Sequence, residues 1–115
     1  MKITKNLKAF LFFSVFVGIA VLSLLPPKRL ELGSSDKLSH FFAYFVLMLT
    51  YGTWRAKNSS RILIGITLLS GYGIFLELLQ GFVPGRVPSV FDVIANTSGV
   101  ILAAAALRLF FNRRS

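Results

Sequence analysis

Four long apolar stretches, separated by short polar segments, make up most of this sequence. They cover residues 9–25, 38–54, 61–83 and 89–111. A helix needs about 20 mainly apolar residues to cross the hydrocarbon core of a bilayer, and each stretch approaches or exceeds that length. Lipid offers no partners to backbone N–H and C=O groups, so such segments cross it as helices. We therefore predict one integral membrane domain over residues 1–115, an all-α bundle of four transmembrane helices.

The segments between the stretches have the composition of helix ends and turns. The pair Pro26–Pro27 lacks amide donors, so the first helix should end there. The run Ser34–Asp36 offers capping groups to the second helix, and Pro84–Gly85 suits a type II turn before the fourth. The Lys-rich N-terminus resembles a signal peptide, but no small-x-small cleavage site follows the first stretch. We therefore expect that stretch to be retained as a helix.

Charge and composition exclude several classes of protein. The net charge of +9 would suit nucleic acid, but the basic residues stand in short clusters beside the apolar stretches. That arrangement is typical of membrane proteins, so we expect membrane lipids as partners and no nucleic acid. With no cysteine and 1 histidine, we expect no disulfide, no cofactor and no bound metal.

The distribution of Lys and Arg predicts the orientation. Three basic residues lie in each of the segments 1–8, 55–61 and 108–114, with no acidic residue among them. The connection 26–37 also has three, beside two acidic residues, and 84–88 has one. Cytoplasmic segments are enriched in Lys and Arg, so we predict that both termini are cytoplasmic and that the connections 26–37 and 84–88 lie outside.

The polar residues of the apolar stretches form pairs at helical spacing. These pairs are Asp36 with His40, Glu77 with Gln80, and Asp92 with Asn96. Alternating helix directions bring all three pairs to the predicted outer end of the bundle. Tyr44 continues the face of His40 inward, and Arg86 lies in the turn above. We predict that these eight residues form an outward-facing polar pocket.

Small residues accompany the polar ones and predict where helices approach each other closely. One stripe is Ser70, Gly73, Glu77 and Gln80, and another is Asp92, Asn96, Gly99, Ala103 and Ala106. Val100 follows Gly99 directly in the sequence, so it should lie outside the face that contains Gly99. Ser14 and Gly18 form a small-xxx-small pair in the first stretch.

Glu77 carries the strongest constraint, because a carboxylate within the hydrocarbon must be paired, protonated or hydrated. His40 is the expected partner, ahead of Arg86, because it starts at a similar depth on a facing helix. Structural explanations stay open for the others. Asp36 and Asp92 could serve as helix caps, Asn96 and Gln80 could hold helices together, and His40 could be structural.

The same residues occur in two ordered patterns. The first is Asp36-Lys37-Leu38-Ser39-His40-Phe41 followed by Tyr44. The second is Glu77-x-x-Gln80-x-Phe82-x-Pro84-x-Arg86, followed by Asp92, Asn96 and Gly99. Together they resemble the signatures of the VanZ-like family of small bacterial membrane proteins, from the second helix to the fourth. The resemblance implies a multi-pass protein of the bacterial cytoplasmic membrane and cell envelope; the founding member is linked to teicoplanin resistance.

Three classes of function remain open. The pocket could bind the headgroup of an envelope lipid, a lipid-linked precursor or a glycopeptide, with Arg86 meeting an anionic group. Alternatively, His40 with Glu77 or Asp92 could perform acid–base catalysis, with a divalent metal at these residues as a weaker variant. The third class is a structural or partner-binding module, in which the cluster only specifies helix packing. The chain could also form a homo-oligomer.

Overall fold

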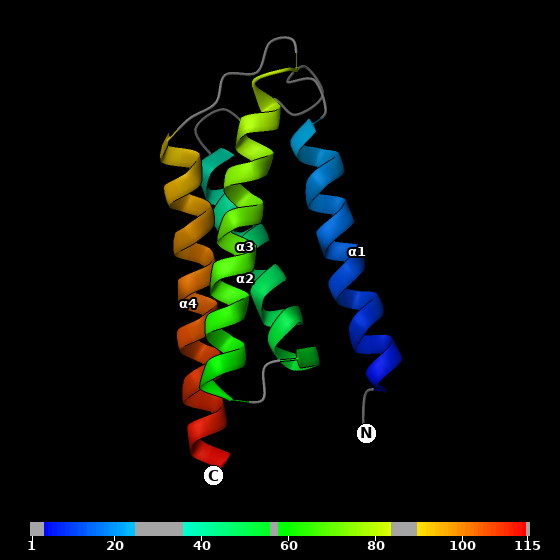
Figure 1. Ribbon diagram of the computed structural model, residues 1–115, viewed down its shortest axis with the longest axis vertical. Helices are drawn as coiled ribbons and strands as arrows, with labels where there is room; N and C mark the ends of the chain where they lie inside the picture. The colour runs from blue at the N-terminus through cyan, green and yellow to red at the C-terminus, as the bar shows by residue number, and fades with distance from the viewer. Residues whose placement is uncertain (1–3, 25–35, 56–57, 84–89, 115) are drawn as a thin grey trace.

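Four helices connected in an alternating up-and-down order form the fold. The computed structural model describes residues 4–24, 36–55, 58–83 and 90–114. The helices are α1 (Lys5–Leu24), α2 (Asp36–Arg55), α3 (Ser59–Gln80) and α4 (Val90–Arg114). The predicted all-α four-helix bundle is confirmed. Both chain ends lie at the same end of the bundle (Figure 1); the side of the membrane that this end faces stays a prediction.

The two ends of the bundle differ in chemistry, and we name them accordingly. The polar end is where α1 and α3 finish and α2 and α4 begin (Figure 1). The basic end is where α1 and α3 begin and α2 and α4 finish. It takes its name from the sequence segments 1–8, 55–61 and 108–114, which carry nine of the 13 basic residues.

The surface of the bundle is that of a membrane protein. Within the described residues, α1, α3 and α4 are long and apolar enough to cross a membrane. Many large apolar side chains lie on the outside, among them Phe10, Leu63 and Leu68. In water such a surface would drive association, whereas in a bilayer it faces the lipid chains. The bundle is 48 Å long, enough to reach both headgroup layers of a membrane about 40–45 Å thick.

α2 is not among the three helices that are apolar enough to cross a membrane by composition alone. It packs against all three other helices, so much of its surface faces protein instead of lipid. Its polar residues include His40 and Tyr44. A helix enclosed in this way can carry polar side chains that would be costly on a lipid-facing surface.

α2 and α4 form the most extensive contact of the bundle. They approach so closely at Gly99 that a Cβ there would meet the backbone carbonyl of Phe41 and the backbone nitrogen of Phe45. Val100, the next residue of α4, is fully buried, as is Leu47 of α2. The prediction that Val100 lies off the packed face is therefore wrong, because the face is wider than a single stripe of small residues.

The other predicted stripes match the buried faces in part. On α3, Gly73, Glu77 and Gln80 are buried, as the pattern predicts. On α4 the stripe holds as far as Ala103, but Ala106 is exposed and Leu107 is buried instead. A helix has 3.6 residues per turn, so the face that contains Ala103 continues four residues later and not three.

The predicted close contact at Ser14 and Gly18 of α1 is wrong. Ser14 is exposed, and a Cβ at Gly18 would meet no atom within 4 Å. α1 instead packs through Phe12 and Ile19, which are both 7% exposed. Aromatic rings hold helix axes apart, so an α1 that contacts its neighbours through rings has no close approach for small residues to permit.

The Gly99 contact predicts a large effect of any side chain at that position. Gly99→Leu should push α4 away from α2 and lower the free energy of unfolding by about 1–3 kcal/mol or more, as overpacking does. Ala105→Leu is the matched control, because Ala105 lies on the exposed face of the same helix. Unfolding of the purified protein in detergent measures both. Equal losses from the two variants would contradict this assignment of the packed face.

Candidate functional site

Polar side chains from α2, α3 and α4 gather within the first turns of the polar end. His40 lies four residues after the start of α2, Glu77 three before the end of α3, and Asn96 six after the start of α4. At 1.5 Å per residue, all three are within about 10 Å of the helix ends. This depth is close to the boundary between the hydrocarbon and the headgroups. We call His40, Tyr44, Glu77, Asp92 and Asn96 the polar cluster.

A hydrogen bond between His40 and Asn96 connects α2 to α4. The ring Nδ1 of His40 lies 2.9 Å from the side-chain oxygen of Asn96, which is 3% exposed. An amide oxygen can only accept, so Nδ1 carries the hydrogen and donates. In the neutral ring this tautomer places the basic lone pair on Nε2. The sequence analysis expected Glu77 as the partner of His40 and did not assign it Asn96; whether Glu77 is paired stays a prediction.

Gly73 of α3 allows Tyr44 and Asn96 to meet between the helices. A Cβ at Gly73 would lie 3.2 Å from both the ring of Tyr44 and the amide nitrogen of Asn96. Both side chains are almost fully buried. Glu77 follows Gly73 by one turn on the same face of α3, and it interacts electrostatically with Tyr44. The three helices therefore bring Tyr44, Glu77 and Asn96 to one place.

Two carboxyl side chains are buried in this region. Glu77 is 5% exposed and Asp92 is 7% exposed, and each has an interaction partner. Asp92 also lies in the first turn of α4, where a negative charge is favoured by the helix dipole. A buried carboxylate inside a membrane is costly, so both residues constrain the packing at this end of the bundle.

Gln80 is also buried, but it faces α1. Its side-chain amide donates a hydrogen bond of 2.9 Å to the backbone carbonyl of Ser23. In a continuing helix that carbonyl would accept from the amide of residue 27, which is Pro27 and has no N–H. Gln80 therefore satisfies a carbonyl that the sequence leaves without its usual donor. This contact is structural and explains Gln80 without a ligand.

Two of the predicted pocket residues are not described by the structure in full. Arg86 lies outside the described residues. Asp36 begins α2, but its side chain lies outside the described part of the molecule. Their predicted contributions to the site therefore stay predictions.

The sequence analysis missed the part that α1 plays and the role of Tyr72. The hydroxyl of Tyr72 donates to the backbone carbonyl of Phe16 in α1, and its ring centroid lies 6.3 Å from that of Tyr44. An aromatic residue in an apolar stretch gives no sign of such a contact. Among the described residues no three His, Cys, Asp or Glu side chains are grouped as a metal site would require.

The chain was compared with known proteins. The profile of the VanZ/LLP1 family matches residues 2–111. The chain belongs to the VanZ/LLP1 family. It is also 32% identical over 108 residues to the uncharacterized protein C11E3.10 of the fission yeast Schizosaccharomyces pombe. The match covers 90% of this chain and 61% of that relative, so the chain spans less than two thirds of its length. No solved structure matches.

Membership of the VanZ/LLP1 family confirms the resemblance read from the two residue patterns. The matched region includes α1, which those patterns did not cover. Together with its apolar helices, the family match identifies the chain as a multi-pass membrane protein.

The hydrogen bond between His40 and Asn96 predicts energetic coupling. His40→Ala and Asn96→Ala should each destabilise this VanZ/LLP1 protein, because each leaves a buried polar partner unsatisfied at a cost of about 1–3 kcal/mol. The double variant should lose less than the sum of the two, with a coupling of about 1 kcal/mol. The free energies of unfolding of the wild type, the two single variants and the double variant in detergent measure this coupling. Thr67→Ala, combined with His40→Ala, is the control, because the hydroxyl of Thr67 bonds within its own helix and the two changes should be additive. Strict additivity of His40→Ala with Asn96→Ala would rule out the bond.

The Gln80 contact predicts a rescue by an unusual substitution. Gln80→Leu removes the donor to Ser23 and should lower the free energy of unfolding by about 1–3 kcal/mol. Replacing both prolines by alanine, Pro26→Ala/Pro27→Ala, lets the helix continue and restores the backbone N–H from which it would satisfy Ser23. The triple variant Gln80→Leu/Pro26→Ala/Pro27→Ala should therefore be more stable than Gln80→Leu alone. A triple variant as unstable as Gln80→Leu, in the same detergent assay, would argue against this role.

Proposed function

We propose that the polar cluster binds the headgroup of a membrane lipid that is hydroxylated or carries an amine. The observation that supports this is the convergence of ionisable and polar side chains from α2, α3 and α4 near the membrane interface. Carboxylates such as Glu77 and Asp92 accept hydrogen bonds from hydroxyl and amine groups. Arg86, in the adjoining turn by sequence, would meet the lipid phosphate.

A purely structural role fits the cluster less well than it fits Gln80. Helix packing in a membrane needs small residues and neutral hydrogen bonds, and Gln80 with Ser23 is of that kind. Ionisable side chains cost more to insert, and those in membrane segments usually mark sites of function. His40, Glu77 and Asp92 are three such residues at one end of a short bundle.

A lipid ligand is favoured over a peptidoglycan precursor or a glycopeptide. His40, Glu77 and Asn96 lie within about 10 Å of the helix ends, a depth that the headgroup of a membrane lipid can reach from its own leaflet. A contribution to teicoplanin resistance, a bacterial cytoplasmic membrane location and a homo-oligomeric state stay predictions.

The second candidate is an enzyme that acts on the same headgroup. The bond from Nδ1 of His40 to Asn96 orients the ring and leaves Nε2 as the basic atom, which is how a general base is held. Glu77 or Asp92 would then donate or accept the second proton. An enzyme of this kind converts a bound lipid, whereas a binding protein returns it unchanged.

Lipid retention tests the binding proposal. The protein, purified from a membrane extract in mild detergent, should retain one lipid class, which native mass spectrometry identifies. Glu77→Gln and Asp92→Asn keep the side-chain shapes but remove the charges, and each should reduce the retained fraction about tenfold, since one charged hydrogen bond is worth about 1.5–3 kcal/mol. Gln80→Leu is the control. Gln80 is buried at the same end of the bundle, and the variant should retain the same lipid as the wild type.

The same measurement separates the alternatives. Identical retained lipids in wild type and all variants would contradict the binding proposal and leave the cluster a structural role. A product lipid that wild type forms during incubation, and that His40→Gln does not form, would show that the protein is an enzyme.

A further inference from the structure

A cavity of about 610 Å³ lies between α1, α2 and α3 in the half of the bundle toward the basic end. Its lining includes Phe12 and Phe16 of α1, Trp54 of α2, and Leu68 and Tyr72 of α3. The volume is within the range of about 300–1,000 Å³ that is typical of sites for small molecules. None of the residues of the polar cluster lines it.

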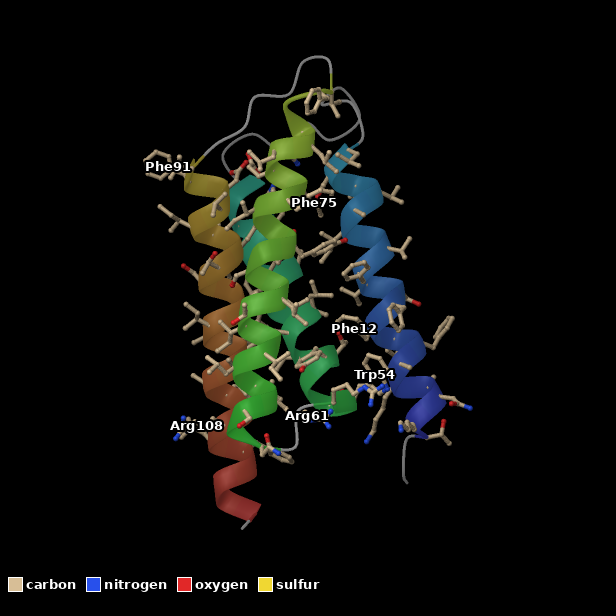
Figure 2. The ribbon with its side chains drawn as sticks, viewed as in Figure 1. Phe12, Trp54, Arg61, Phe75, Phe91 and Arg108 are labelled. Carbon is tan, nitrogen blue, oxygen red and sulfur yellow. The ribbon has the colours of Figure 1, made fainter. Side chains whose placement is uncertain are left out.

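Two stacked aromatic pairs form the walls of this cavity. Phe12 and Trp54 stack with ring centroids 5.5 Å apart, and Phe16 and Tyr72 stack at 4.1 Å. Figure 2 shows Phe12 and Trp54 close together in the lower part of the bundle. The rings act as spacers that hold α1 away from the rest of the bundle, so the space between them is a consequence of aromatic packing. The walls are apolar and suited to a hydrocarbon chain.

The exposed members of the lining show where the cavity meets its surroundings. Ile64 and Leu68 are 51% and 63% exposed, on a face of α3 that is directed to lipid. Arg55 and Arg61 also line the cavity and are exposed. The cavity therefore opens both to the lipid chains and to two guanidinium groups near the headgroup layer. This combination matches a molecule with an apolar chain and an anionic head.

Basic residues predominate at this end of the bundle. The sequence segments that flank it, 1–8, 55–61 and 108–114, hold nine of the 13 basic residues and none of the four acidic residues. The guanidinium of Arg55 lies 4.5 Å from the centroid of the Trp54 ring, which holds it at the edge of the cavity. Anionic lipid headgroups are a source of balancing charge in a membrane.

We propose that this cavity binds an anionic phospholipid from the surrounding leaflet. Its acyl chain lies between the two aromatic stacks, and its phosphate contacts Arg55 and Arg61. Guanidinium groups bind phosphate through paired hydrogen bonds, which favours these two residues as the contact. The site is separate from the polar cluster, because none of the residues of the cluster lines the cavity, so either site can exist without the other.

The single tryptophan of the chain provides a direct test. Trp54 lines the cavity, and bromine atoms on a lipid chain quench tryptophan fluorescence on contact. The full chain is reconstituted in bilayers that contain brominated phosphatidylglycerol among unlabelled phosphatidylcholine, or the reverse. Phosphatidylglycerol should quench Trp54 with an apparent affinity about thirtyfold higher than phosphatidylcholine, because each of the two arginines near the membrane surface contributes about 1 kcal/mol toward an anionic lipid.

Two variants locate the effect. Arg55→Gln/Arg61→Gln removes both guanidinium groups from the cavity and should abolish the preference for phosphatidylglycerol. The hydroxyl of Tyr51 bonds the backbone carbonyl of Arg61, so the substitution leaves that contact in place. Arg108→Gln removes a cation from α4 at the same end that does not line the cavity, and it should keep the wild-type preference. Quenching by brominated phosphatidylcholine shows that Trp54 remains in contact with lipid in each variant.

Two results would overturn the proposal. Equal quenching by the two lipids in wild type would mean that the cavity does not select an anionic headgroup. An equal loss of preference in Arg108→Gln and in the double variant would mean that the general surface charge, and not the cavity, attracts the lipid.

Discussion

The close approach of α2 and α4 at Gly99 sets the position of the polar cluster. A Cβ at that point would meet the backbone of Phe41, so the two helices touch almost without intervening side chains. Asn96 lies about one turn before Gly99 on α4, and His40 precedes Phe41 on α2. The 2.9 Å hydrogen bond between them is therefore possible only while the backbones stay this close. The absence of one methyl group at Gly99 is what brings a histidine and an amide together inside a membrane.

The bundle keeps its two kinds of charge apart. The described carboxyl side chains, Glu77 and Asp92, are buried at the polar end, and each has an interaction partner. The arginines Arg55, Arg61 and Arg108 are exposed at the basic end. Buried ions need specific partners, whereas exposed arginines near a membrane surface can use water and lipid headgroups. The two ends are consequently suited to different molecules.

The fold followed from the sequence because it depends on length and hydropathy. Four apolar stretches of spanning length leave few arrangements open in lipid, and the polar face of α3 followed from the spacing of Gly73, Glu77 and Gln80. The bond from His40 to Asn96 did not follow. Asn96 is near the depth of His40, but whether the two side chains meet depends on helix rotation, which neither periodicity nor depth specifies. The packing of α1 could not be predicted for a related reason. The contacts of Phe12 and Phe16 depend on the orientation of their rings, which the sequence does not specify. The pair Ser14 and Gly18 fits the small-xxx-small motif, but that motif marks a contact only where another helix comes close.

Tyr72 lines the cavity between α1, α2 and α3 and also lies next to the polar cluster. Tyr72 lies beside Tyr44 of the cluster, and its other neighbour is Phe16 of the cavity, on which it stacks and to whose carbonyl it donates. Two side chains of α3, Tyr72 and Gln80, each bond a backbone carbonyl of α1. A shift of α1 must therefore either break the bond of Tyr72 or move its ring against Tyr44. Tyr72 thus connects the packing of α1 to the polar cluster.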